Sequence, residues 1–272
     1  MKTDLICDLG DPRLDPYRNL KTARLHRRAG LFIAEGDKVV ERLLASDYEV
    51  ASILVSAQRS ARFSQLAPPH VELLAIQDRL ASQLVGFKFH AGVMACGRRK
   101  PQPGFGRIAS SRFLIGCSHV DDPENLGGII RLCAVFGVEG LILGRGCADP
   151  FSRRVLRVSM GNGFCLPIYE SGDLVADLAR LRTESGFQLV AAVADPDAEA
   201  LEAFRRSERA LVVFGNEAHG LEPDLIDICS HRVTIPMRSG TDSLNVAVAA
   251  GIILHTFWAR GSHPGHEELF RG

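Results

Sequence analysis

Residues 112–137 read RFLIGCSHVDDPENLGGIIRLCAVFG, and this pattern decides how the larger part of the chain is expected to fold. The apolar run at 112–120 predicts a buried strand, and a helix is expected from about Asn125 to Phe136, ending at Gly137. The polar segment between them predicts a loop, with Asn125 as a candidate helix cap. Apolar strands that alternate with helices are typical of a parallel sheet covered on both faces.

The same alternation continues to the end of the chain. Further strands are expected at 140–144, 187–195, 210–215 and 231–237, and further helices at 152–160, 201–206 and 243–258. The sequence therefore predicts an α/β domain with a parallel sheet, whose ligands bind beyond the carboxyl ends of the strands.

A smaller α/β domain is expected before it, because short apolar runs and a helical pattern also occur in the first hundred residues. They predict strands at 31–34, 51–56 and 71–76, a helix after the first of these, whose apolar positions are Val39, Val40, Leu43 and Leu44, and a second helix at 78–86. A segment rich in Pro, Gly, Ser and Arg separates the two parts. We therefore divide the chain into a first domain at 1–97, a linker at 98–111 and a second domain at 112–272.

Composition narrows the class of protein. No apolar run reaches the roughly 18 residues that a membrane span needs, and the start, MKTDLICDLG, lacks a signal-peptide core, so a cytoplasmic protein is expected. The seven cysteines are scattered singly, which argues against disulfides and against a zinc site, so no metal is expected.

The two parts of the chain differ in charge. Residues 1–112 carry 18 Lys and Arg against 11 Asp and Glu, whereas residues 113–272 carry 14 Lys and Arg against 21 Asp and Glu. This asymmetry indicates a basic first domain that meets a polyanion, although solvated faces alone could also produce it.

Three polar loops follow the strands at 112–120, 210–215 and 231–237. The first contains Asn125, Gly127 and Arg131. Arg131 lies among apolar residues, so it is either a functional residue or a surface arginine whose aliphatic part covers apolar neighbours while its charged group reaches water. The second, VVFGNEAHGL (212–221), places Glu217 in a turn, as a dipole-stabilised carboxylate or as a functional group. Neither the dinucleotide-binding G-x-G-x-x-G nor the P-loop pattern is present.

The third loop, IPMRSGTDSLN (235–245), has more polar groups than one helix cap requires. We expect Asp242 or Ser243 to cap the last helix and Asn245 to point from its first turn; Thr241 is a further polar neighbour.

Together the three loops resemble the motifs of the SPOUT class of RNA methyltransferases, in its SpoU (TrmH-like) branch. The first matches Asn-x-Gly-x-x-x-Arg, the second Gly-x-Glu-x-x-Gly-Leu, and the third Ile-Pro-Met followed by Ser-Leu-Asn-Val. The resemblance covers about residues 112–260. The first domain is similar to the substrate-binding domain of some members, which resembles ribosomal protein L30e; here Phe32, Glu35 and Gly36 match Phe-x-x-Glu-Gly.

The resemblance implies a deep trefoil knot, a homodimer with the site near its interface, and S-adenosylmethionine as cofactor. It assigns these residues to the cofactor: Phe214, Gly215, Asn216, Glu217, Gly220, Leu221, Ile235, Pro236, Met237, Ser243, Leu244, Asn245 and Val246. It assigns these residues to catalysis: Arg131, Asn125, Glu217, Ser243 and Asn245.

The implied reaction is methylation of an RNA ribose 2′-hydroxyl, which is a weakly acidic nucleophile. Because the pKa of a guanidinium exceeds about 12, we favour stabilisation of the forming oxyanion by Arg131; a deprotonated Arg131 is the competing account. Asn125 would position the ribose or Arg131, and Glu217 would orient Arg131 or its neighbours.

Ribosomal RNA is the favoured substrate, because the first domain resembles a ribosomal-protein-type RNA reader, and transfer RNA is the alternative. Arg24, Arg27, Arg28 and Lys38 are candidate phosphate contacts in the first domain. A non-catalytic RNA-binding member, methylation of a base, and an unrelated α/β ligand-binding domain are the rival interpretations.

Overall fold

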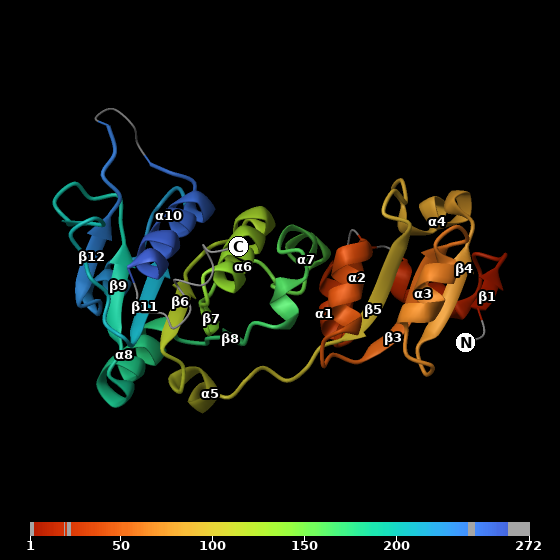
Figure 1. Cartoon of the computed structure of the whole chain (residues 1–272), viewed down its shortest axis with the longest axis horizontal. Coiled ribbons are helices and arrows are strands. Elements are labelled where there is room, and N and C mark those ends of the chain that lie inside the picture. Colours follow the sequence, from red (N-terminus) through yellow and green to blue (C-terminus); the bar gives the residue numbers. More distant parts are fainter. Residues whose placement is uncertain (1–2, 19, 21–22, 239–242, 261–272) are drawn as a thin grey trace, which may run out of the picture. The chain divides into compact units, whose positions relative to one another are not determined.

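The computed structural model describes residues 3–18, 20, 23–238 and 243–260, which form two compact units (Figure 1). The first unit comprises residues 1–101 and Asp149–Cys165, and the second comprises Gln102–Ala148 and residues 166–272. Among the described residues, no helix is long and apolar enough to cross a membrane.

The first unit contains a five-stranded mixed sheet in the order β1-β4-β3-β5-β2. Strand β5 runs antiparallel to β2 and β3, and the other pairs are parallel. Its strands are β1 (Thr3–Ile6), β2 (Leu31–Glu35), β3 (Val50–Ser56), β4 (Glu72–Ile76) and β5 (Val93–Arg98). Its helices are η1 (Pro12–Tyr17), α1 (Ala23–Arg28), α2 (Asp37–Leu44), α3 (Ser60–Leu66), α4 (Asp78–Val85), α7 (Arg153–Val158) and η2 (Asn162–Phe164).

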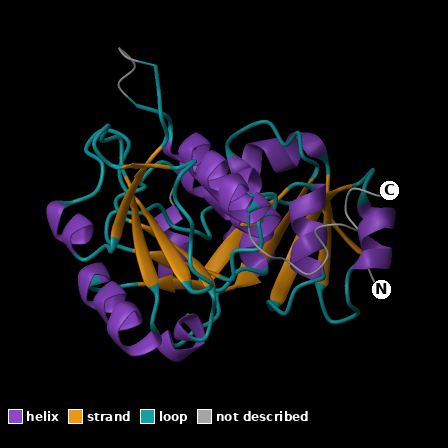
Figure 2. Cartoon of the chain, turned by 60° about the vertical axis from the view of Figure 1, so that its left-hand side comes forward, coloured by secondary structure: helices purple, strands orange, loops and turns teal. Residues whose placement is uncertain are grey.

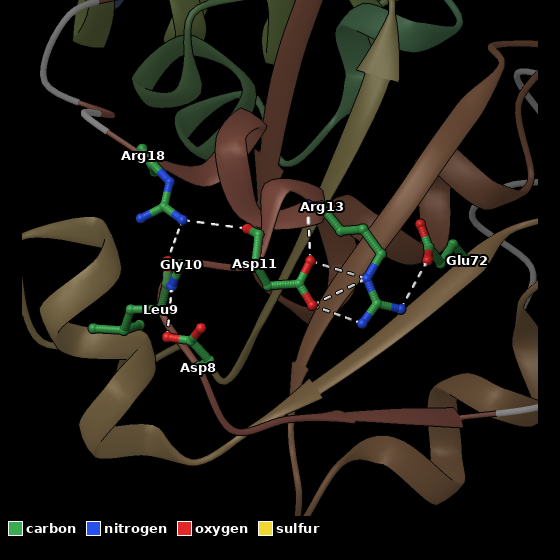
Figure 3. Close-up of polar contacts among 7 residues, drawn as sticks. All are labelled: Asp8, Leu9, Gly10, Asp11, Arg13, Arg18 and Glu72. Atoms are coloured by element: carbon green, nitrogen blue, oxygen red, sulfur yellow. Dashed lines mark hydrogen bonds and ion pairs between the residues drawn. The ribbon is translucent and has the colours of Figure 1, made fainter.

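Ion pairs and hydrogen bonds connect residues near the start of this unit with one another and with β4 (Figure 3). Asp11 caps η1 by accepting a hydrogen bond from the backbone N–H of Arg13, and the Arg13 guanidinium bonds to both Asp11 and Glu72. The hydrogen bonds from Arg13 lower the pKa of the Asp11 carboxyl. Arg18 donates to the backbone carbonyls of Leu9 and Asp11.

The segment Asp149–Cys165 belongs to the first unit, whereas the sequence division assigned it to the second domain. Leu156 and Phe164 are buried in the same apolar cluster as Phe32 of β2. Arg153 pairs with the buried carboxylate of Glu35 and lies over the ring of Phe87. The segment therefore completes the core of the first unit from a distant part of the chain.

The second unit contains a seven-stranded, entirely parallel sheet in the order β10-β12-β9-β11-β6-β7-β8 (Figure 2). Its strands are β6 (Phe113–Cys117), β7 (Gly140–Leu143), β8 (Ile168–Glu170), β9 (Gln188–Ala192), β10 (Glu199–Ala200), β11 (Ala210–Phe214) and β12 (His231–Thr234). Its helices are α5 (Phe105–Ala109), α6 (Pro123–Val135), α8 (Leu174–Ser185), α9 (Pro223–Asp227) and α10 (Val246–Ala259). The predicted α/β class and parallel sheet are confirmed.

Helices cover both faces of this sheet, as the fully buried strands require. Leu114 of β6 packs in one apolar cluster with residues of α5, α8 and α9. Phe113, the preceding residue of β6, points to the opposite face and contacts Phe257 of α10, which packs on α6.

Several expected elements differ from the structure: the strand expected at 187–195 ends at Ala192, and the helix expected from 243 begins at Val246. Two further differences have a clear physical reason. The helix expected at 201–206 is wrong: Glu199 and Ala200 form strand β10 beside β12, and a turn follows. Six residues are too few for a helix to form without tertiary support, and pairing with the sheet prevails. Strand β12 ends at Thr234, three residues before the expected end, because Pro236 has no N–H for the ladder.

Candidate functional site

Three side chains, one from each polar loop, meet at the carboxyl edge of the second sheet. Glu217 Oε1 accepts hydrogen bonds from the amides of Asn125 and Asn245, the latter at 2.8 Å. The Asn245 amide also donates to Asn125 Oδ1 at 2.8 Å. We call Asn125, Glu217 and Asn245 the amide–carboxylate network; it joins residues up to 120 positions apart.

Asn245 has a second task, as the N-cap of α10. Its Oδ1 accepts from the backbone N–H groups of Ala247 and Val248 at 3.0 and 3.2 Å. The expectation that Asp242 or Ser243 caps this helix is therefore wrong; Asp242 and Thr241 lie outside the described residues. Because its oxygen serves the helix and its N–H₂ serves the network, Asn245 connects the start of α10 to the other two loops.

Asn125 does not cap α6, contrary to expectation. The helix begins two residues earlier, at Pro123, with Asp122 as its cap accepting from Glu124 N–H at 2.8 Å. Proline fits the first helical position because that N–H has no partner within the helix. Asn125 is thereby placed inside the first turn, buried, and free to bond to Glu217.

The second loop is closed on itself. Asn216 and Gly220 exchange two backbone hydrogen bonds, and a Cβ on Gly215 would lie 2.2 Å from the carbonyl oxygen of Gly220. Gly220 has a φ of +70°, a conformation that favours glycine. The turn therefore depends on glycine at 215 and 220, and it presents Glu217 to the other loops.

A cavity of about 490 Å³ lies at this edge of the sheet, within the range of small-molecule sites. Eleven of the thirteen residues predicted to bind the cofactor line it, all except Pro236 and Asn245. A further wall, which was not predicted, is formed by Ala192 at the end of β9 and by Val193, Ala194 and Asp195 after it. The signal was available, because the predicted strand at 187–195 ends at the same edge.

The walls of the cavity are mostly apolar, with charged groups at separate points. Phe214, Leu221 and Ile253 are among the apolar lining residues, and the side chains of Asp195, Glu217 and Arg232 also line it. Asp195 Oδ2 accepts from Arg232 at 3.2 Å, and its Oδ1 accepts from the backbone of Asp197. Such a cavity suits a flat apolar ring together with a cationic group.

Arg131 lies on α6, six residues after Asn125, and its side chain is exposed. Within the described part of the chain it forms no hydrogen bond or ion pair, and Glu217 accepts its hydrogen bonds from Asn125 and Asn245. Ser243 is also exposed, and it lines the cavity.

The candidate phosphate contacts lie on two helices of the first unit. Arg27 and Arg28 are exposed on α1, and Lys38 is exposed at the start of α2, 3.8 Å from Glu41. The side chain of Arg24 lies outside the described part of the structure. No group of three or more His, Cys, Asp or Glu placed to hold a metal ion occurs among the described residues.

Comparisons with known proteins identify the family. Residues 112–255 match the model of the SpoU rRNA Methylase family, and residues 12–95 match the MRM3-like substrate binding domain. An uncharacterized tRNA/rRNA methyltransferase of Mycobacterium bovis is 37% identical, over 96% of this chain and 93% of its own length. The 23S rRNA (guanosine(2553)-2′-O)-methyltransferase RlmP of Bacillus subtilis is 25% identical, over 89% and 94%.

A solved structure is similar over nearly the whole chain. The SpoU methyltransferase AviRb from Streptomyces viridochromogenes, in complex with the cofactor AdoMet, has a TM-score of 0.78 at 25% identity, over 92% of this chain and 98% of its own. The family inferred from the three loops is confirmed, and a substrate-binding domain precedes the methylase domain. The chain belongs to the SpoU rRNA methylase family.

Proposed function

We propose that this chain transfers the methyl group of S-adenosylmethionine to a ribose 2′-hydroxyl of ribosomal RNA. The observation that carries the proposal is the amide–carboxylate network beside the cavity, which brings the three family loops together. The names of RlmP and of other relatives, which describe 23S rRNA 2′-O-methyltransferases, support the substrate class.

The cavity has the chemistry that the cofactor needs. Leu244 and Val246 would hold the adenine ring, and backbone groups around Gly215 and Gly220 would bind its polar edge. Carboxylates at Asp195 and Glu217 would stabilise positive charge. When bound, the cofactor supplies a sulfonium-linked methyl group, so the transfer itself requires no metal.

Arg131 would stabilise the oxygen that becomes negative as the 2′-hydroxyl attacks. A guanidinium keeps its proton in proteins, which makes it a donor of hydrogen bonds to an oxyanion and a poor base. Asn125 would position the ribose. A deprotonated Arg131 that removes the proton is the competing account, and the two differ in how the rate depends on pH.

We infer that the last part of the chain threads through a loop to form the trefoil knot of the family. The sheet order supports this. Strand β12 lies next to β9, on the side away from β11 and β6, whereas the following helix α10 packs on α6, which follows β6 in the sequence. The first unit would have the L30e-like fold and bind RNA, with Arg27, Arg28 and Lys38 as phosphate contacts.

We also infer a homodimer through α6 and α10. Val135, Val248 and Ile252 are exposed on these helices, which is a costly arrangement for a face in water. Arg131 lies four residues before Val135 and therefore on the same stripe of α6. A second copy on this face would bring Arg131 to the interface, close to one of the two sites.

The test is transfer of labelled methyl from S-adenosylmethionine to total unmodified RNA, resolved by size. Wild type should label large ribosomal RNA, and Arg131→Ala should abolish transfer while cofactor binding by calorimetry stays unchanged. Arg107→Ala, which removes an exposed arginine on α5, is the matched control.

Each alternative outcome has a definite meaning. Label in the tRNA band would replace the proposed substrate by transfer RNA. RNA binding without label in any band, including ribosomal particles, would favour a non-catalytic member. Equal loss of transfer and cofactor binding in Arg131→Ala would contradict its proposed role.

A further inference from the structure

His119, two residues after the end of β6, has a backbone conformation that is uncommon for residues other than glycine. Its φ is +53°, and only Met160 shares a positive φ among the described non-glycine residues. Such a conformation persists only where the surrounding structure enforces it, and it concentrates at functional sites. Neither the proposed chemistry nor the proposed cofactor site uses this residue.

The side chain and backbone of His119 are both anchored. Nδ1 lies 2.7 Å from Glu222 Oε1, and the hydroxyl of the buried Ser118 donates to the same oxygen at 3.0 Å. The backbone carbonyl of His119 accepts from the amide of Asn216 at 2.9 Å, and its N–H donates to the carbonyl of Arg145. The ring is therefore fixed by contacts from two other loops.

A second position is shaped to accommodate the ring. A Cβ on Gly146 would lie 2.3 Å from His119 Cδ2, and Gly146 itself has a φ of +76°. Any larger residue at 146 would displace the imidazole. Two unusual backbone conformations, at 119 and 146, thus combine to hold one side chain in place.

The ring remains accessible to a ligand. The His119 side chain is 53% exposed, and Nε2 forms no hydrogen bond with any residue in the described ranges. Nδ1 is therefore fixed, whereas about half of the side chain is exposed and Nε2 has no partner among the described residues, which is the arrangement of a preorganised contact and not of a core residue.

Its position indicates what the contact is. His119 lies six residues before Asn125 in the same loop, and Asn216, which bonds to its carbonyl, lines the cavity. RNA is recognised through unpaired bases that stack on aromatic side chains, histidine included, and that bond through their edges.

We propose that His119 binds a nucleotide of the substrate RNA next to the accepting ribose, by stacking and through Nε2, and so contributes to the choice of target. This inference rests on the proposed RNA methyltransferase function. Glu222 and Gly146 are positioning residues, because they act through the orientation of the ring.

The test replaces His119 by glycine, which adopts a positive φ without strain, so the fold should be retained. We expect RNA to bind about ten-fold more weakly, as loss of one stacked base would cause. This should appear as a higher KM for RNA with a smaller change in kcat, and cofactor binding should not change. His119→Asn also tolerates this backbone but has no ring, and should lose affinity similarly.

Two further variants separate the contact from a structural role. Glu222→Gln retains the ring but weakens its anchor, so a smaller loss of RNA affinity is expected. His70→Ala removes an exposed histidine of the first unit and should have no effect.

The outcomes distinguish the inference from the function on which it rests. Methyl transfer by wild type with an unchanged KM and RNA affinity in His119→Gly would overturn the inference alone. Loss of cofactor binding in His119→Gly would also overturn it, because the residue would then support the cavity. No methyl transfer by wild type to any RNA would overturn the proposed function; in that case equal RNA affinity of wild type and His119→Gly rejects the contact as well.

Discussion

The two units use their polar groups differently. In the first unit, charged side chains pair with charged neighbours, as Arg153 does with Glu35, Arg98 with Glu49 and Arg13 with Asp11. The second unit also has ion pairs, such as that of Arg232 with Asp195, but at its candidate site the amide–carboxylate network joins uncharged amides to one carboxylate. Beside this network, Arg131 has no hydrogen bond or ion pair with another described residue.

This difference indicates which groups are available for a ligand. A paired guanidinium must break its ion pair before it binds phosphate, so the paired arginines of the first unit are weaker RNA contacts than composition implied. An arginine without an ion pair, such as Arg131, is available for a ligand. Net charge therefore locates a binding surface less reliably than the partners of each charge do.

The largest effect on stability is expected at the pair of Glu35 and Arg153 in the first unit. Glu35→Ala leaves Arg153 without its carboxylate; Glu35 is only 5% exposed, and the Arg153 side chain is 29% exposed. We expect the free energy of unfolding to fall by about 3 kcal/mol, measured by urea unfolding with circular dichroism. Glu49→Ala, which breaks the exposed pair with Arg98, should cost less than about 1 kcal/mol. Equal effects of the two variants would contradict the distinction.

The next effect is expected in the glycine turn of the second unit. Gly215→Ala places a methyl group 2.2 Å from the Gly220 carbonyl oxygen, so we expect a loss of about 1–3 kcal/mol from strain. Because the turn lines the cavity, S-adenosylmethionine should no longer bind in calorimetry. Gly172→Ala, where nothing lies within 4 Å, is the matched control. Normal cofactor binding by Gly215→Ala would show that the turn can move away.

A smaller effect separates the two tasks of Asn245. Asn245→Ala removes both the cap of α10 and the network, and should cost about 1 kcal/mol of stability. Asn245→Asp retains a capping oxygen, but it replaces the donor to Glu217 by a second carboxylate, whose repulsion offsets the retained cap, so stability should fall by a similar amount. Methyl transfer should fall in both variants. If Asn245→Asp transfers as wild type does, the network is not needed for the reaction.

The smallest expected effect is visible only in alkali. Burial raises the pKa of Tyr48 to about 12, and it raises the pKa of Tyr17 further and that of Tyr169 less strongly. Because the folded state holds these protons more tightly, their stabilising contribution is complete below about pH 10 and decreases as pH rises toward 12. Phenolate absorbance should therefore appear for Tyr169 first and for the two tyrosines of the first unit later. Simultaneous titration near the ordinary value would contradict the burial of Tyr17 and Tyr48.

Much of the fold and of the cavity could be predicted because the relevant signals are local. Apolar strands followed by Gly-rich loops place Gly215, Glu217 and Leu244 at one edge without knowledge of the packing. The network could not be predicted, because the choice of Asn245 over Ser243 as the cap depends on Glu217, 28 residues away. The wall at Ala192–Asp195 was missed because its loop carries no motif, and the placement of His119 depends on Gly146 and Glu222, which no spacing rule connects to it.

The segment Asp149–Cys165 also has a consequence for the order in which the protein is made. A chain leaves the ribosome from its N-terminus, so residues 1–101 emerge well before the segment that completes their core. Leu156 and Phe164 arrive only after β6, α6 and β7 have been synthesised. The first unit can therefore complete its core only late in synthesis. If the chain were expressed as two fragments divided at the linker, the first fragment would lack part of its core, and the second would carry the missing residues without the core on which they pack.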